Sequence, residues 1–253
     1  MTEIKIWGIK VTPLTKKQVV ELIEYHIDNI SGLFHLTGVN PETIAQAQDH
    51  AELCRAINSS DVVNIDNMLV VTSLRLLGYK IPERAASPDI FELLLELINR
   101  KGYSVYFLGA KENVLRKMLR KLKEQYPDMN ITGARNGYFK PDEEPSVVAE
   151  INQLSPDLLF IALPTPQKEL FILRNKMSLN TRFAYGVGGA FDVLAGVIKR
   201  APLWMRNIGL EGIHRSLQNP STYMPRYYKY YLPFMKLFFR ELFHKKRLNY
   251  NNN

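Results

Sequence analysis

Short apolar runs alternate with helical patterns along most of the chain, and this alternation limits the possible folds more than any other feature. Branched and aromatic residues predict strands at 4–9, 33–36, 62–65, 104–108, 130–133, 158–163 and 182–186. Helical periodicity predicts helices at 16–28, 42–49, 51–58, 68–77, 89–101, 112–125, 146–153, 166–176 and 190–195. Because strands that alternate with helices form layered sheets with parallel pairing, we expect an α/β fold with a mostly parallel sheet.

The charge of the chain is concentrated at one end. The 253 residues carry a net charge of +8, and they suffice for one sizeable core or two small domains. Residues 199–253 hold eleven Lys and Arg against two acids, a balance of +9, which leaves −1 for residues 1–198. We therefore expect a core over 1–198 and a basic, aromatic-rich C-terminal appendage over 199–253.

Aromatic and basic side chains interleave in the appendage. Ten aromatic residues and seven Lys or Arg lie between Tyr223 and Tyr250. This pattern fits a terminal helix packed on the domain, a nucleic-acid-binding segment, or an interfacial helix that meets anionic lipid. Nothing else resembles a nucleic-acid module, so we expect no nucleic acid and favour an anionic membrane surface. The expected membrane contacts are Tyr227, Tyr231, Phe234, Phe238, Lys245 and Lys246.

The remaining composition narrows the class of protein. The first residues carry an acid and no long apolar core, so no signal peptide is expected there. No window reaches the roughly 18 uncharged apolar residues that a membrane span needs. One cysteine, Cys54, excludes an intramolecular disulfide framework and a multi-cysteine metal site. These features predict a cytoplasmic protein.

Two polar residues, Asp66 and Asn40, stand between a predicted strand and the next predicted helix, where ligands bind in α/β sheets. Asp66 follows the strand at 62–65. It could act as a general base on a hydroxyl or cap the next helix, and position alone slightly favours the cap. Asn40 could likewise bind a ligand or cap the next helix. Its position just before Pro41 and the predicted helix at 42–49 favours capping.

Two further loops follow strands in the same way. The turn at 186–192 is rich in glycine, so its backbone amides could approach an anionic group such as a diphosphate, or it could be a plain tight turn. Gln167, Lys168 and Glu169 follow the strand at 158–163. Four polar loops at four strand ends indicate one shared crevice more strongly than any single loop does.

Several common catalytic motifs are absent from the sequence. There is no P-loop, no G-x-S-x-G elbow, no H-E-x-x-H and no D-x-D motif for a metal–nucleotide complex. An early glycine fingerprint for a nicotinamide cofactor is also missing. We therefore expect no cofactor and no metal, and any sugar-nucleotide chemistry would be metal-independent.

A long signature near the C-terminus resembles a known family. Gly186-Val-Gly-Gly-Ala-Phe-Asp-Val-Leu-Ala-Gly196 is followed by Lys199-Arg-Ala-Pro202, Trp204-Met205, Gly209-Leu-Glu211, Arg215 and Gln218-Asn-Pro220. This run closely resembles the C-terminal signature of the WecG/TagA/CpsF bacterial glycosyltransferases. Shorter matches upstream, among them Asn40-Pro-Glu42, Asp66 and Gly137-Tyr-Phe139, extend the resemblance over roughly residues 4–231.

The resemblance implies a Rossmann-like, inverting, metal-independent glycosyltransferase. Such enzymes move a sugar from a UDP-sugar to a sugar on polyprenyl diphosphate, in cell-surface polysaccharide or teichoic acid biosynthesis. The donor sugar would be N-acetylmannosamine, its uronic acid or a hexose. The appendage would complete the active site and hold the enzyme peripherally on the inner face of the plasma membrane. An oligomer is compatible with this class.

The resemblance also assigns site residues. Asp66 would be the general base, and Arg215 and Arg226 would bind the lipid diphosphate. The donor or substrate would be bound by Thr37, Asn40, Asn67, Arg84, Gln167, Lys168, Glu169, Gly188, Gly189, Asp192 and Arg200.

The chain departs from the family pattern in four places, one of which is Gly212, where family members often have a tryptophan after the glutamate. Gly38 stands where the family has a threonine, and Gln167-Lys168 reverses the usual Lys-Gln order. Thr222 and Pro225 replace two arginines of the appendage. A membrane-recruited scaffold that keeps the fold without catalysis is the alternative, and the retained Asp66 argues against it.

Overall fold

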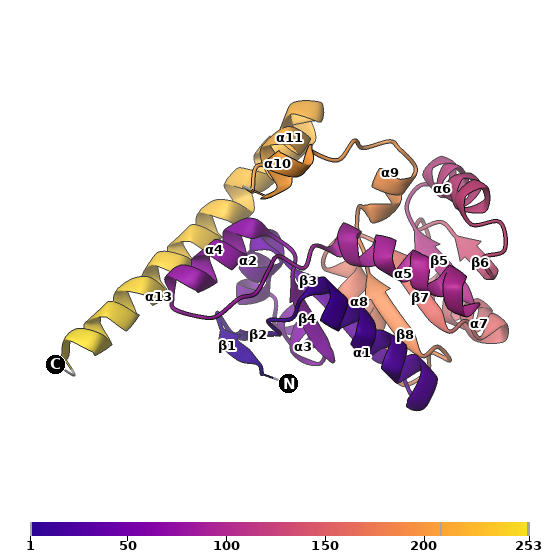
Figure 1. The fold of residues 1–253 in the computed structure, drawn as a ribbon, viewed down its shortest axis with the longest axis horizontal. Helices are drawn as coiled ribbons and strands as arrows, with labels where there is room; N and C mark the ends of the chain where they lie inside the picture. The colour runs from indigo at the N-terminus through magenta and orange to yellow at the C-terminus, as the bar shows by residue number, and fades with distance from the viewer. Residues whose placement is uncertain (1, 208, 252–253) are drawn as a thin grey trace.

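The protein is described from a computed structural model that covers residues 2–207 and 209–251. Its centre is a six-stranded sheet in the order β4-β3-β8-β7-β5-β6, in which every neighbouring pair is parallel. The strands are β3 (Phe34–Val39), β4 (Val62–Ile65), β5 (Val105–Gly109), β6 (Ile131–Arg135), β7 (Leu158–Ala162) and β8 (Phe183–Gly186). The predicted α/β fold with a parallel sheet is confirmed (Figure 1).

The helices of the body pack on this sheet. They are α1 (Lys16–Asn29), α2 (Pro41–Asp49), α3 (Ala51–Asn58), α4 (Met68–Leu76), α5 (Ser87–Lys101), α6 (Glu112–Gln125), α7 (Glu144–Leu154), α8 (Gln167–Asn175) and α9 (Ala190–Leu194), with a 3-10 turn at Pro141–Glu143. Side chains of Thr15, Asn40 and Asn67 cap α1, α2 and α4. Polar residues at strand ends therefore set where these helices begin.

The first predicted strand forms a separate hairpin. Residues 4–9 contribute to β1 (Ile4–Ile6) and β2 (Ile9–Val11), which pair only with each other and are antiparallel. Trp7 and Gly8 form the turn with positive φ angles of 53° and 76°. A two-residue turn of this kind needs positive φ at both positions, which Gly8 supplies without steric cost.

The appendage begins with short helices and ends in a long one. It contains α10 (Leu203–Asn207), α11 (Glu211–Gln218), α12 (Pro220–Arg226), a π-helical turn η2 (Tyr227–Tyr231) and α13 (Leu232–Asn251). Figure 1 shows α13 running from the region of α11 past α4 and α2, with its C-terminal end projecting beyond the body. None of the described helices combines the length and the apolar character that a membrane crossing requires.

The first half of α13 belongs to the hydrophobic core, which corrects part of the membrane expectation. Phe234 and Phe238 are only 0% and 5% exposed, in a cluster with the hairpin, α2 and α4. The rings of Trp7 and Phe234 meet edge to face with centroids 5.2 Å apart. These two phenylalanines cover the apolar hairpin, so they are not available to a membrane. The side chains of Lys245 and Lys246 lie outside the described part of the structure.

Candidate functional site

A cavity of about 400 Å³ lies at the carboxyl ends of the central strands. Gly38 and Asp66 line it from β3 and the end of β4, while Ala162 and Gly186 line it from β7 and β8. The appendage forms the opposite wall through Glu211, Gly212, Tyr223, Arg226, Tyr227 and Tyr231. All four polar loops contribute lining residues, so the sequence correctly indicated one shared crevice.

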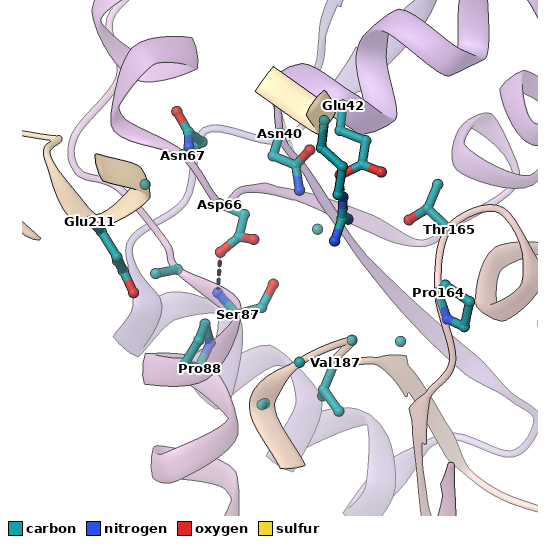
Figure 2. A pocket seen from close by; sticks show the side chains of 18 of the residues that line it. Asn40, Glu42, Asp66, Asn67, Ser87, Pro88, Pro164, Thr165, Val187 and Glu211 are labelled. Atoms are coloured by element: carbon teal, nitrogen blue, oxygen red, sulfur yellow. Dashed lines mark hydrogen bonds and ion pairs between the residues drawn. The ribbon is translucent and has the colours of Figure 1, made fainter. Parts of the chain in front are cut away.

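Asp66 is positioned by backbone hydrogen bonds on two elements (Figure 2). Its amide donates to the carbonyl of Val39 at 2.9 Å, and its Oδ1 accepts from the amide of Ser87 at 2.6 Å. The cap of α4 is Asn67, whose side chain accepts from the amide of Leu69 at 2.8 Å. The helix-cap interpretation of Asp66 is therefore wrong, and its carboxylate lines the cavity.

A buried phenol lies beneath this carboxylate. The hydroxyl of Tyr185 on β8 is fully buried, next to the side chains of Ser87 and Asn64. Burial first, and then the negative charge of Asp66, raise the pKa of Tyr185 far above its ordinary value. The phenol therefore stays protonated near the Asp66 carboxylate.

Asn40 both caps a helix and faces the cavity. Its Oδ1 accepts from the amide of Thr43 at 3.1 Å, with Pro41 at the first helical position of α2. Asn40 also lines the cavity beside Glu42 (Figure 2). The two interpretations of Asn40 therefore do not exclude each other.

Thr37 points away from the cavity, and Gly38 takes its place. Thr37 is buried, and its hydroxyl is 2.9 Å from Nε2 of His35 and 2.8 Å from Oγ of Ser60. Burial lowers the pKa of His35 to about 3, with the charge of Lys176 a smaller cause. Because successive strand residues face opposite sides, Thr37 serves this buried cluster while Gly38 lines the cavity.

The first turn of α8 brings a cation into the cavity. Lys168 lines it, and its amine contacts the hydroxyl of Thr165 and the carboxylate of Glu169. A Cβ at Gly186 would lie 2.9 Å from Cδ of Lys168, so the glycine leaves room for the lysine stem. Glu169 itself is buried behind Lys168, with Oε2 lacking a hydrogen-bond partner in the described structure.

Gln167 faces a different hollow. It lines a second cavity of about 740 Å³ together with Phe139, Phe171 and Arg174. Leu163 separates this second cavity from the first, since it lines both. The reversed Gln-Lys order thus places lysine, not glutamine, at the main cavity.

The glycine-rich turn lines the cavity as expected. Gly188, Gly189 and Asp192 all face it at the start of α9. Gly188 has a φ of +53°, and apart from its neighbours in the chain no described residue comes within 4 Å of where its Cβ would be. The turn therefore presents open backbone to a ligand.

Arg200 acts outside the cavity lining. Its Nη2 lies 2.5 Å from Oδ1 of Asp89 on α5, and its Nη1 lies 3.3 Å from Oε1 of Glu92. Arg206 reaches the same Asp89 oxygen at 3.4 Å. Burial alone would raise the pKa of Asp89, but the hydrogen bond and charge of Arg200 outweigh it and lower that pKa. These arginines fasten the appendage to α5.

Two ion pairs join the appendage to the body at the cavity wall. Arg84 and Glu211 meet at 2.9 Å, and Arg226 and Glu42 meet at 2.6 Å. All four residues line the cavity. The side chain of Arg215, expected beside Arg226, lies outside the described part of the structure.

Aromatic residues of the appendage close the remaining side. The rings of Tyr227 and Tyr231 meet edge to face at 4.4 Å, and both line the cavity. Asn67 donates to the hydroxyl of Tyr231 at 3.5 Å. The structure thus places both tyrosines, which were expected at a membrane, in the wall of the site.

Several polar lining residues were not singled out as site residues from the sequence, among them Glu42, Ser87, Thr165 and Glu211. Glu42 and Glu211 belong to motifs that match the family. An acidic residue in such a motif, close to a predicted site loop, is a signal that could have identified both as site residues. Ser87 contributes through its backbone amide, which no side-chain pattern reveals. Thr165 lies between two prolines after a strand. Only its contact with the amine of Lys168 shows that it helps to hold that lysine.

The cavity of this α/β fold combines a carboxylate at a strand end with arginines held by acidic residues, and comparison with known families gives the class of protein. Residues 4–248 match the model of the Glycosyl transferase WecG/TagA/CpsF family, and the chain belongs to this family of glycosyltransferases. It is 31% identical over 212 residues, 82% of each chain, to a Bacillus subtilis (strain 168) protein named N-acetylglucosaminyldiphosphoundecaprenol N-acetyl-beta-D-mannosaminyltransferase. A Bacillus spizizenii protein of the same name is 32% identical over 198 residues, 78% of this chain and 76% of that relative. The family resemblance in the sequence is confirmed.

Proposed function

We propose that this enzyme transfers a sugar from a UDP-sugar to a sugar carried on polyprenyl diphosphate, in cell-surface polysaccharide or teichoic acid synthesis. The names of both relatives support this acceptor class, because they specify an N-acetylglucosaminyldiphosphoundecaprenol acceptor. The same names favour N-acetylmannosamine over its uronic acid or a hexose as the transferred sugar.

The position of Asp66 carries the proposal. Its carboxylate lines the cavity at the end of β4 and is oriented by the amide of Ser87. In the proposed step this carboxylate takes the proton of the acceptor hydroxyl, whose oxygen attacks the anomeric carbon. The bond from that carbon to the diphosphate oxygen breaks, and UDP leaves with the electron pair. Attack opposite to the leaving group inverts the anomeric configuration.

The leaving diphosphate gains negative charge, and Lys168 is placed to meet it. Its amine is held by Thr165 and Glu169 at the cavity, so it needs little reordering. Fixed positive groups stabilise developing charge best when they are oriented before the reaction. The open amides of Gly188 and Gly189 line the same space and would add hydrogen bonds to the phosphates.

Arg226 is our candidate for the acceptor diphosphate. It lines the cavity from the appendage and is half exposed, at 48% of its side chain. The ring of Tyr223 lies 5.8 Å from its guanidinium carbon, and Glu42 holds its Nη2. A guanidinium fixed in this way suits bidentate binding of phosphate oxygens. Arg215 remains a second candidate from the sequence.

The outer side of the appendage supports a membrane contact. Large apolar side chains are exposed along one side of the continuous helix formed by η2 and α13, at spacings of four, seven and four residues: Tyr228, Leu232, Phe239 and Phe243. Lys229, Lys236 and Arg240 are exposed among them. Each basic residue near anionic lipid adds about 1 kcal/mol to membrane binding. We propose that this exposed stripe lies on the inner face of the plasma membrane.

A transfer assay tests the proposal. The enzyme is incubated with N-acetylglucosaminyl-diphosphoundecaprenol and a panel of UDP-sugars, and the lipid products are identified by mass. We expect transfer of N-acetylmannosamine, and a loss of about 10²–10⁴-fold in rate for Asp66→Asn with unchanged folding. Binding of UDP-sugars without transfer to this acceptor would favour the scaffold alternative, and full activity of Asp66→Asn would reject the assigned base.

A further inference from the structure

The amide that holds Asp66 belongs to the first residue of a long helix. Helix α5 begins at Ser87, and the residue before it, Ala86, has no side chain that could cap the helix. The carboxylate of Asp66 accepts from the Ser87 amide at 2.6 Å instead. A carboxylate at a helix N-terminus is stabilised in its charged form by the amide and by the helix dipole.

The side chain of Ser87 sits against a position that only glycine occupies without collision. A Cβ at Gly38 would lie 2.5 Å from Oγ of Ser87, and 3.3 Å and 3.4 Å from the side-chain atoms of Asn64. Asn64 is fully buried and donates to the carbonyl of Ala85 at 2.6 Å, two residues before Ser87. Gly38 and Asn64 therefore determine where the start of α5 can lie.

We propose that Ser87, seated against Gly38, is the positioning residue of the Asp66 carboxylate. This inference rests on the proposed role of Asp66 and adds a device that sets its orientation and its charge. Ser87 acts through its backbone amide, and the missing side chain at Gly38 leaves the room that lets Ser87 and its amide lie there. The glycine that departs from the family pattern is then part of the catalytic arrangement.

The amide can be tested by a single-atom change. Replacing Ser87 by its α-hydroxy acid exchanges the N–H for an ester oxygen and removes the donor while keeping the side chain. A matched ester at Glu112, the first residue of α6, is the control because it lies outside the described cavity lining. We expect the ester at 87 to lower kcat by about tenfold or more, with KM nearly unchanged. Loss of an amide that favours the charged carboxylate also moves the acid limb of the pH–rate profile to higher pH.

The close fit of the Ser87 side chain against Gly38 can be tested by paired substitutions. Gly38→Ala places a methyl group against Oγ of Ser87, so we expect a lower kcat with the same upward move of the acid limb. Adding Ser87→Ala removes the colliding oxygen but keeps the amide, so the double variant recovers most of the rate and the original pH limb. Circular dichroism and thermal melting confirm that each variant is folded.

The outcomes separate this inference from the proposed function. If Asp66→Asn keeps full activity, the assignment of the base fails. If Asp66→Asn is inactive but the ester at 87 has the wild-type rate and pH profile, the positioning role is overturned and the base assignment stands. If the rate losses from Gly38→Ala and Ser87→Ala simply add, with no recovery in the double variant, the claim that Gly38 makes room for Ser87 is overturned.

Discussion

Arg84 and Glu211, which are 127 residues apart in the chain, form a 2.9 Å ion pair in the wall of the cavity. Arg84 comes from the body, and Glu211 comes from the appendage. Both side chains are largely buried, so the pair is screened little by solvent. The appendage is therefore part of the cavity wall and is tied to the body there.

Glu211→Gln should loosen the appendage. Removing one charge of a mostly buried pair leaves Arg84 without its counter-ion, which we expect to cost about 2 kcal/mol in the free energy of unfolding. Limited proteolysis should then cut faster after residue 198, and transfer should slow about tenfold. Glu52→Gln is the matched control, because Glu52 forms an exposed pair with Arg55. Equal proteolysis of the two variants would contradict the fastening role.

Lys168→Met should affect both rate and stability. Loss of the cation at the leaving diphosphate should lower kcat by about a hundredfold. The buried carboxylate of Glu169 would lose its counter-charge, so urea unfolding should show a loss of about 3 kcal/mol. Lys168→Met/Glu169→Gln should recover much of the stability but none of the rate. A double variant that recovers both would show that Lys168 serves packing only.

Buried His35 should make stability depend on pH. Its pKa is lowered to about 3 in the folded chain by burial, against an ordinary value of 6.5, so the unfolded chain binds more protons between these values. Above pH 6.5 His35 is neutral in both states and does not lower the free energy of unfolding. As the pH drops from 6.5 toward 3, that free energy falls because only the unfolded chain binds the proton. Between pH 7 and pH 5 we expect a loss of about 2 kcal/mol. Urea unfolding of His35→Asn should lack this part of the pH dependence, and an identical pH dependence would contradict it.

The exposed and buried faces of α13 should respond differently to substitution. Leu232→Glu/Phe243→Glu should abolish sedimentation with phosphatidylglycerol vesicles while the melting temperature stays nearly unchanged, since both side chains are exposed. Phe234→Ala should instead cost about 3–5 kcal/mol in the free energy of unfolding because it empties a core position. Vesicle binding that survives the double substitution would reject the stripe as the membrane contact.

The sequence predicts the central sheet well because most of its strands, β5 and β7 above all, are rich in apolar residues. It places Asp66, Asn40 and the glycine-rich turn at strand ends, and the structure brings them to one cavity. The alternation of residues along the strand could not show whether Thr37 or Gly38 lines the cavity, because a one-residue shift reverses which face a strand residue occupies. The exact register comes from pairing in the folded sheet, where Gly38 lies opposite Asn64.

Helical periodicity could not tell a membrane face from a core face in the appendage. Phe234 and Phe238 are buried, while Phe239 and Phe243 are exposed, although all four are phenylalanines on one helix. The difference comes from the β1–β2 hairpin, which offers an apolar surface to one side only. Composition likewise suggested a boundary near residue 198, yet a chain cut there would uncover Trp7 and its neighbours.

The contact between Trp7 and Phe234 has a consequence for synthesis of the enzyme. Translation makes Trp7 almost at once, but its cover is made only after more than two hundred further residues. Until then the hairpin keeps an apolar face that is free to bind chaperones or other chains. Residues 209–231, several of which line the cavity, are made just before this cover, so the cavity wall and the cover of the hairpin are both completed at the end of synthesis.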